Sequence, residues 1–259
     1  MRDSAADPED VACGVDLAVR AGQVTMRWYS SRRLSSRTKG DGSPVTDADR
    51  AAEEFLRNEL ARRYPDDGVV GEEYGATEGA SGRRWVIDPI DGTRSFVRGV
   101  PLFATLLALI DGSGPAVGVA HVPPLDETVS AGRGLGAAHT CGGEARRARV
   151  SDVRVPEDSY LVTSGIEYLP ERGRRLLLHP GLLVRTWGDG YGYVLLATGR
   201  AEIMLDAGLE LWDVAPMLVI VPEAGGTLTD YDGGDGPVSG DVVSTNGHLH
   251  RFAVQQLAR

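Results

Sequence analysis

An apolar run meets two aspartates in the segment Trp85-Val86-Ile87-Asp88-Pro89-Ile90-Asp91-Gly92-Thr93. We expect a strand here, followed by a turn that directs Asp88, Asp91 and the Ile90 carbonyl into one small volume. Three oxygen donors placed in this way suit a hard cation such as Mg²⁺. An ordinary Asp-Gly turn between a strand and a helix would explain the same letters, so the hypothesis needs support from elsewhere in the chain.

The two residues that end this segment are suited to a phosphate group. Gly92 has no side chain, so the backbone can approach a ligand closely there. If a helix begins at this point, the amides of Gly92 and Thr93 lie at its N-terminus, where backbone N–H groups bind phosphate. The segment therefore combines donors for a cation with donors for an anion.

Acidic residues in three other segments extend this hypothesis. Glu72 follows a predicted strand, Asp213 lies at the start of an apolar helix, and Asp49 lies in a predicted first helical turn. Each has an ordinary explanation, because adjacent acids are commonly solvated and aspartate favours helix N-termini. None of the three indicates a metal site by itself.

One reaction accounts for these residues together. Four acids would form an all-carboxylate site: Glu72, Asp88, Asp91 and Asp213. They would repel one another unless cations neutralised them. Two Mg²⁺ ions roughly 3.5–4 Å apart would do so, and such a pair serves in phosphoryl displacement. The Thr93 hydroxyl beside the Asp49 carboxylate would orient and deprotonate a water, so Asp49 and Thr93 are the predicted catalytic residues.

The patterns on either side predict two differently built halves. In residues 1–150 we expect an α+β half with an antiparallel sheet and most of the metal ligands: helices at 9–29 and 46–64, strands at 68–71, 85–88, 102–110, 116–122 and 127–131, and small edge strands within 132–149. In residues 151–259 we expect an α/β half with Asp213 and the substrate-side residues: strands at 160–163, 183–186, 202–205, 227–229 and 242–244, and helices at 171–178, 190–198, 214–221 and 249–257.

Charge and cysteine content exclude several classes of protein. The chain has 259 residues, with 37 acids against 27 Lys and Arg, and a formal net charge of -10. That balance argues against a nucleic-acid polymer as partner. Two distant cysteines provide neither a disulfide framework nor a zinc-finger site. The acidic N-terminus does not resemble a signal peptide, and the run at 102–110 is too short to span a membrane, so we expect a cytoplasmic protein.

Three motifs occur in a fixed order: Gly-Glu-Glu at 71–73, Asp-Pro-Ile-Asp-Gly-Thr at 88–93, and Trp-Asp-Val-Ala at 212–215 with Glu-Ala-Gly-Gly at 223–226. In order, spacing and flanking sequence they resemble the inositol monophosphatase family of Mg²⁺-dependent phosphatases, over nearly the whole chain. The resemblance implies an α+β fold, the layered α-β-α-β-α sandwich of the inositol monophosphatase/fructose-1,6-bisphosphatase type. It also implies a small phosphorylated metabolite as substrate.

The resemblance implies a role for each metal ligand. Glu72, Asp88 and the Ile90 carbonyl would hold one Mg²⁺. Asp88, Asp91 and Asp213 would hold the second, so Asp88 would bridge the two ions. A third, weaker Mg²⁺ near Glu72 assists in some members, so two or three ions are expected.

The resemblance also covers the catalytic residues and the assembly. Asp49, rather than Asp47, falls on the position of the water-activating aspartate, and Thr93 falls on that of its partner. Lys39 falls in the family's mobile catalytic loop, here residues 30–43. Members are commonly homodimers, so a homodimer is expected here.

Within the family, the segments 96–101, 104–106, 185–189 and 209–213 are most similar to the bacterial histidinol-phosphatase branch. Hydrolysis of L-histidinol phosphate to L-histidinol is therefore the expected reaction. That substrate carries an ammonium and an imidazole, which acids could bind. The expected substrate and phosphate contacts are Gly92, Thr93, Arg185, Gly188, Asp189, Asp206 and Glu210, with further contacts from the segment 163–168.

Other functions remain open at this point. The substrate could be inositol 1-phosphate, or a sugar or nucleoside monophosphate of a specialised pathway. A protein of another class, which binds metal and a ligand without turnover, would keep the same carboxylates but not need Asp49 and Thr93. A structural Ca²⁺ site would also use clustered aspartates.

Overall fold

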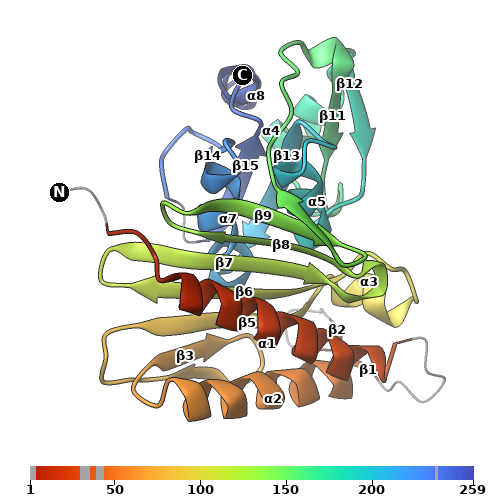
Figure 1. Ribbon diagram of the computed structural model, residues 1–259. Coiled ribbons are helices and arrows are strands. Elements are labelled where there is room, and N and C mark those ends of the chain that lie inside the picture. Colours follow the sequence, from red (N-terminus) through yellow and green to blue (C-terminus); the bar gives the residue numbers. More distant parts are fainter. Residues whose placement is uncertain (1–3, 30–35, 39–43, 237–238) are drawn as a thin grey trace.

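The computed structural model describes residues 4–29, 36–38, 44–236 and 239–259 (Figure 1). Its described strands form three sheets. The largest has eight strands in the order β10 (Glu144–Arg147), β9 (Gly136–Cys141), β8 (Glu127–Gly132), β7 (Gly114–Val122), β6 (Ala104–Asp111), β5 (Arg84–Asp91), β3 (Gly68–Gly71) and β4 (Gly75–Thr77). Neighbouring strands are antiparallel except for the parallel pair β3 and β5.

The second sheet has five strands of mixed direction. Their order is β12 (Leu182–Arg185), β11 (Ser159–Val162), β13 (Ile203–Leu209), β15 (Gly240–Thr245) and β14 (Thr227–Asp230). β11 runs parallel to β12 and β13, whereas β15 runs antiparallel to both of its neighbours. A third, two-stranded sheet pairs β1 (Ser36–Thr38) with β2 (Pro44–Thr46).

Helices cover both sheets and separate them. The described α-helices are α1 (Pro8–Met26), α2 (Asp47–Arg63), α3 (Thr93–Val97), α4 (Glu171–Leu177), α5 (Asp189–Ala197), α6 (Leu211–Val214), α7 (Met217–Glu223) and α8 (His250–Leu257). α1 and α2 pack side by side on the outer face of the large sheet, α5 and α7 lie between the sheets, and α4 and α8 cover the small one (Figure 1). The five layers are the α-β-α-β-α order expected for this fold class.

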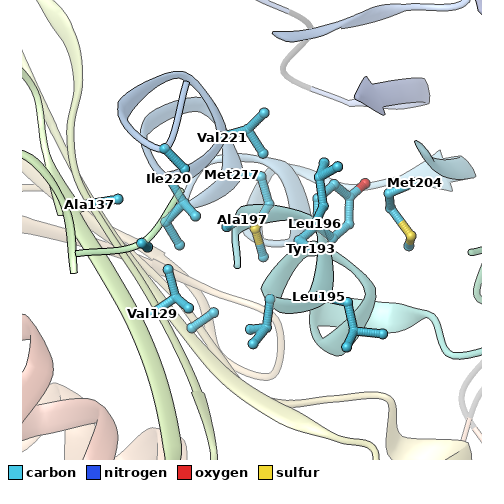
Figure 2. Packing of buried hydrophobic residues seen from close by; sticks show 14 of the residues in the cluster. Val129, Ala137, Tyr193, Leu195, Leu196, Ala197, Met204, Met217, Ile220 and Val221 are labelled. Carbon is cyan, nitrogen blue, oxygen red and sulfur yellow. The ribbon is translucent and has the colours of Figure 1, made fainter. Parts of the chain in front are cut away.

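The core between the sheets joins the two halves of the chain. Val129 and Ala137 of the large sheet face α5 and α7, which contribute Leu196 and Ile220, and Met204 of the small sheet closes the other side (Figure 2). These side chains are buried, and burial of apolar surface at about 25 cal/mol per Å² drives their association. Residues before and after position 150 therefore share one core.

Most predicted elements are confirmed, including the edge strands β9 and β10, but one helix was wrong. Residues 214–221 were expected to form one helix, and the structure divides them between α6 and α7. The division falls at Pro216, which has no N–H to continue the hydrogen-bond ladder of α6 and instead begins α7 as its N-cap. The first helix also ends at Met26 rather than near residue 29.

Two other sequence predictions concern the loop at 30–43 and membrane-spanning segments. Most of the predicted 30–43 loop, including Lys39, lies outside the described residues. Within the part that the structure describes, no helix is long and apolar enough to cross a membrane.

Candidate functional site

A β-bulge brings two predicted metal ligands to one face of the large sheet. In β5, Asp88 pairs with Leu106 of β6, and Asp91 pairs with Ala104. Three steps along β5 therefore oppose two steps along β6, which is the definition of a bulge. In a regular strand, residues three apart point to opposite faces, whereas the extra residue turns Asp91 to the face of Asp88. Pro89 occupies the bulge, where its missing N–H costs no ladder hydrogen bond.

The helix α6 brings a third carboxylate to the same place. Asp213 is held by a reciprocal cap: its Oδ2 accepts from the Glu210 amide at 2.8 Å, while the Glu210 side chain accepts from the Asp213 amide. One carboxylate oxygen each of Asp88, Asp91 and Asp213 lie within 4.8 Å of one another. These three residues can therefore ligate one ion.

The first turn of α2 places Asp49 beside these acids. Its Oδ2 accepts from the Thr46 amide at 2.8 Å and from the Thr46 hydroxyl at 2.5 Å, in a capping box at the start of α2. Asp49 is 1% exposed. The charges of Glu72 and Asp49 both act on Asp88, which places all five acids in one electrostatic cluster.

Burial and mutual repulsion disfavour the ionised form of these carboxylates. Burial, followed by the charges of Glu72 and Asp91, raises the pKa of Asp88 well above its ordinary value. Burial is also the main cause that raises the pKa of Asp213 to about 7 and that of Asp49 to about 6. A divalent cation would remove the repulsion, and an all-oxygen donor set suits Mg²⁺. The residues present therefore fit the metal that the sequence predicts.

A cavity of about 380 Å³ opens beside the cluster, and Asp91 and Asp213 form part of its wall. The rest of the wall comes from α3, the β11–α4 loop, α5, β13 and α7. Polar lining residues include Arg94, Ser95, Ser164, Glu167, Tyr168, Asp189, Tyr193 and Asp206. The cavity is large enough for a small metabolite whose phosphate lies at the carboxylate cluster.

Comparison with known proteins identifies the family and agrees with the fold. The model of the inositol monophosphatase family matches residues 7–259. The chain belongs to the inositol monophosphatase family. It is 41% identical over 254 residues to a histidinol-phosphatase of Mycobacterium tuberculosis, covering 96% of this chain and 98% of that protein. It is 33% identical over 257 residues to an inositol-1-monophosphatase of Mesorhizobium japonicum, covering 95% and 94% of the two chains.

Solved structures agree with this assignment. The extragenic suppressor protein suhB of Bartonella henselae superposes with a TM-score of 0.86 at 32% sequence identity, covering 95% of this chain and 96% of that one. The family and its named relatives identify this member as a phosphoric monoester hydrolase, and Mg²⁺ dependence is typical of the family. The binding protein without turnover is therefore not supported.

In this family member, the predicted substrate residues separate into two groups. Gly92, Asp189 and Asp206 line the cavity. Asp189 lies where α5 begins, with φ of 50°, and the amide of the next residue, Gly190, donates to the Asp91 carboxylate. Ser164 joins the two acids, because its hydroxyl donates to Asp206 at 2.9 Å and accepts from the Asp189 amide at 2.8 Å.

The other predicted substrate residues are placed outside the cavity lining. Arg185 donates to the Val184 carbonyl and stacks its guanidinium on the Trp187 ring. A side chain at Gly188 would meet the Ser164 backbone at 2.1 Å, so this glycine serves close packing. The Glu210 carboxylate caps α6.

The predicted catalytic pair is close to the cluster but not joined. Among the described residues, the structure has no hydrogen bond between Asp49 and Thr93. The Thr93 hydroxyl instead donates to the Ile90 carbonyl at 3.0 Å. Gly92 is the N-cap of α3 and has a φ of 85°. This left-handed backbone conformation favours glycine. The roles of Asp49 and Thr93 stay predictions.

Sequence reasoning missed Arg94 and the buried Glu53. Arg94 lies one residue after Thr93, and its guanidinium lies 5.3 Å from the centre of the Tyr168 ring at the cavity. Its place in the first turn after the Asp-Gly-Thr motif was the signal that pointed to it. Glu53 follows Asp49 by one helical turn, and an acid at that spacing was the available signal.

Proposed function

We propose that this phosphatase hydrolyses L-histidinol phosphate to L-histidinol and inorganic phosphate. The observation that supports this substrate is the charge of the cavity. Apart from Asp91 and Asp213, its wall carries the acids Glu167, Asp189 and Asp206, against Arg94 as the basic residue in the described lining. An excess of negative charge suits a substrate whose organic part is cationic. The identity of 39–41% with three proteins named histidinol-phosphatase agrees with it.

The buried acids of the cavity are suited to an ammonium or imidazolium group. Burial raises the pKa of Asp189 to about 6 and that of Asp206 well above its ordinary value. A cationic ligand would lower both, because a nearby opposite charge favours the ionised form. Ser164 binds the Asp206 carboxylate and the backbone amide of Asp189, and so holds the two residues together. The uncharged hydroxyl groups of a polyol substrate would interact less favourably with these carboxylates.

One Mg²⁺ would be held by Glu72, Asp88 and the Ile90 carbonyl. A second would be held by Asp88, Asp91 and Asp213, and a third would lie near Glu72. The ions would polarise the phosphate and lower the pKa of a bound water. The amides of Gly92 and Thr93 would hold the phosphate oxygens.

Asp49 would accept the proton of the attacking water. In the metal-free protein, burial is the main cause that raises the pKa of Asp49 to about 6, above that of an ordinary aspartate, and a general base benefits from such a rise. Both described hydrogen bonds to its carboxylate fall on Oδ2, which leaves Oδ1 to face the water. The Thr93 hydroxyl would orient that water.

Phosphate release from a substrate panel tests the proposal. The purified chain is assayed with Mg²⁺ against L-histidinol phosphate, inositol 1-phosphate, and several sugar and nucleoside monophosphates, each with an EDTA control. We expect kcat/KM to favour L-histidinol phosphate by about 100-fold. A site with buried polar groups discriminates against substrates that leave those groups unpaired. A preference for inositol 1-phosphate or another neutral ester would overturn the substrate while leaving the phosphatase activity intact.

Two variants link the preference to the cavity wall. Glu167→Gln removes one acid of the wall, and Glu171→Gln removes an exposed acid just outside it. We expect Glu167→Gln to raise KM for L-histidinol phosphate about 5-fold with inositol 1-phosphate unchanged, since an exposed ion pair contributes up to about 1 kcal/mol. Glu171→Gln should behave like the wild type. Equal losses on both esters would argue against a charge-based preference.

We also propose that the enzyme is a cytoplasmic homodimer, as its family resemblance implies. Light scattering on the eluted protein measures the mass, and 27.6 kDa is the monomer value. A mass twice that value supports the dimer, and the monomer value contradicts it.

A further inference from the structure

Glu53 is a fully buried carboxylate on α2. Its side chain has no exposed surface and lies one helical turn after Asp49, on the same helix face. A buried charge is costly unless hydrogen bonds and an opposite charge compensate for it. The partners of Glu53 therefore indicate why the fold keeps it.

Those partners lie on the turn that carries Glu72. Residues 72–74 join β3 to β4, and Glu53 accepts from the Glu73 amide at 2.8 Å and the Tyr74 amide at 3.1 Å. Charged acceptors of backbone N–H groups make the stronger class of hydrogen bond. Glu53 thus holds the two residues that directly follow Glu72.

Arg57 completes the arrangement from the next turn of α2. Its Nε donates to Glu53 at 2.8 Å, its Nη1 donates to the Thr77 hydroxyl at 3.1 Å, and its Nη2 donates to the Gly75 carbonyl. β4 is a three-residue, exposed strand at the edge of the sheet. β4 pairs with β3 along its length, and Arg57 adds a second attachment that ties β4 and the turn before it to α2.

Close packing at Gly71 supports the same conclusion. A Cβ at Gly71 would lie 2.2 Å from Glu53 Oε1, which no real contact allows. The carboxylate therefore lies directly against the strand residue before Glu72. Glu53 contacts the backbone on both sides of that residue.

We propose that Glu53 is a positioning residue that sets the distance of Glu72 from Asp49 and Asp88, and thereby the affinity for the metal that Glu72 ligates. The inference rests on the proposed assignment of Glu72 to a metal. Asp49 lies on α2, and Glu72 lies on the turn that Glu53 binds from α2. The Glu53 side chain therefore fixes the position of Glu72 relative to Asp49. The partners that orient a metal ligand typically contribute about 10- to 100-fold in metal affinity.

Mn²⁺ binding to the full chain tests this inference without depending on turnover. Free Mn²⁺ is followed by electron paramagnetic resonance during titration of the wild type, Glu53→Gln, Glu72→Gln and the control Glu54→Gln, which changes an exposed acid on the same helix. We expect Glu53→Gln to weaken one class of Mn²⁺ site about 10-fold and to leave the other unchanged. Its kcat at saturating Mg²⁺ should stay within about 2-fold of the wild type, with the half-saturating Mg²⁺ concentration raised.

Each other outcome is decisive. Unchanged Mn²⁺ affinity in Glu53→Gln, with only a lower free energy of unfolding, would give Glu53 a purely structural role and overturn the inference. If Glu53→Gln does not fold, Arg57→Gln removes the ion-pair partner, and wild-type Mn²⁺ affinity in that variant would overturn it equally. If Glu72→Gln loses a Mn²⁺ site while Glu53→Gln keeps it, the proposed function stands and this inference falls. If Glu72→Gln keeps every site, the metal assignment itself fails.

Discussion

The Thr93 hydroxyl donates a hydrogen bond of 3.0 Å to the Ile90 carbonyl oxygen, so the predicted water-orienting group and a predicted metal ligand are in direct contact. A carbonyl oxygen has two lone pairs, so Ile90 could ligate a metal while it still accepts from Thr93. The hydrogen bond would then hold the Thr93 hydroxyl beside the metal that the Ile90 carbonyl is proposed to ligate.

Replacing Thr93 tests this relationship. We expect Thr93→Val to lower kcat about 100-fold, because it removes a group that orients the water and leaves the metal ligands in place. Thr93→Ser, which keeps the hydroxyl, should retain activity within about 10-fold. Steady-state kinetics at saturating Mg²⁺ make the comparison, and equal losses in the two variants would show that the methyl group, not the hydroxyl, matters.

Asp88→Asn is expected to reduce kcat/KM by on the order of 1,000-fold, because Asp88 is proposed to bridge both ions and several kcal/mol of charge stabilisation depend on them. Asp152→Asn, at a fully exposed position, is the matched control. Phosphate release is measured for both variants over a full range of Mg²⁺ concentrations. Activity of Asp88→Asn within a few-fold of the wild type would remove Asp88 from the centre of the mechanism.

Ser164→Ala breaks the link between Asp189 and Asp206. Loss of one hydrogen bond of about 1 kcal/mol predicts an approximately 5-fold rise in KM for a cationic substrate, with kcat for a neutral ester unchanged. The exposed Ser239→Ala is the control. A fall in kcat on both esters would instead place Ser164 in the chemistry.

Stability of the metal-free enzyme should fall as pH rises from about 4 to about 7. The pKa of Asp213 rises from 3.8 in an unperturbed side chain to about 7 on folding, chiefly through burial. In that interval the folded protein keeps a proton that the unfolded chain releases, so the free energy of unfolding decreases with pH. Denaturant titrations in EDTA at several pH values measure this slope.

Adding Mg²⁺ should reverse that trend. Protons and metal compete for the same oxygens, so Mg²⁺ should stabilise the protein more at pH 8 than at pH 5. Stabilisation independent of pH would place the binding ion away from these carboxylates.

Local sequence patterns were sufficient for most of the fold. Alternating apolar residues and short turns predicted β6, β7 and β8, because an antiparallel meander is built from neighbours in sequence. The division at Pro216 was missed because the apolar pattern continues across it, although the ring cannot continue the hydrogen bonds.

The site was only partly accessible from sequence. Asp88, Asp91 and Asp213 were predicted together, and their oxygens do converge. Residue type alone could not separate Asp206, which lines the cavity, from Glu210, which caps α6, since only the folded positions distinguish them. Arg94 and Glu53 depend on contacts between distant segments, which no local pattern encodes.

Because of the bulge in β5, the site depends on the number of residues between Asp88 and Asp91 as well as on their chemistry. Adding one residue between Asp88 and Asp91, with the bulge kept, would oppose four steps along β5 to three along β6 and carry Asp91 to the far side of the sheet. An insertion of one residue here would thus separate the two carboxylates even with every acidic residue retained. In descendants of this sequence, insertions between Asp88 and Asp91 should be rarer than substitutions at Pro89.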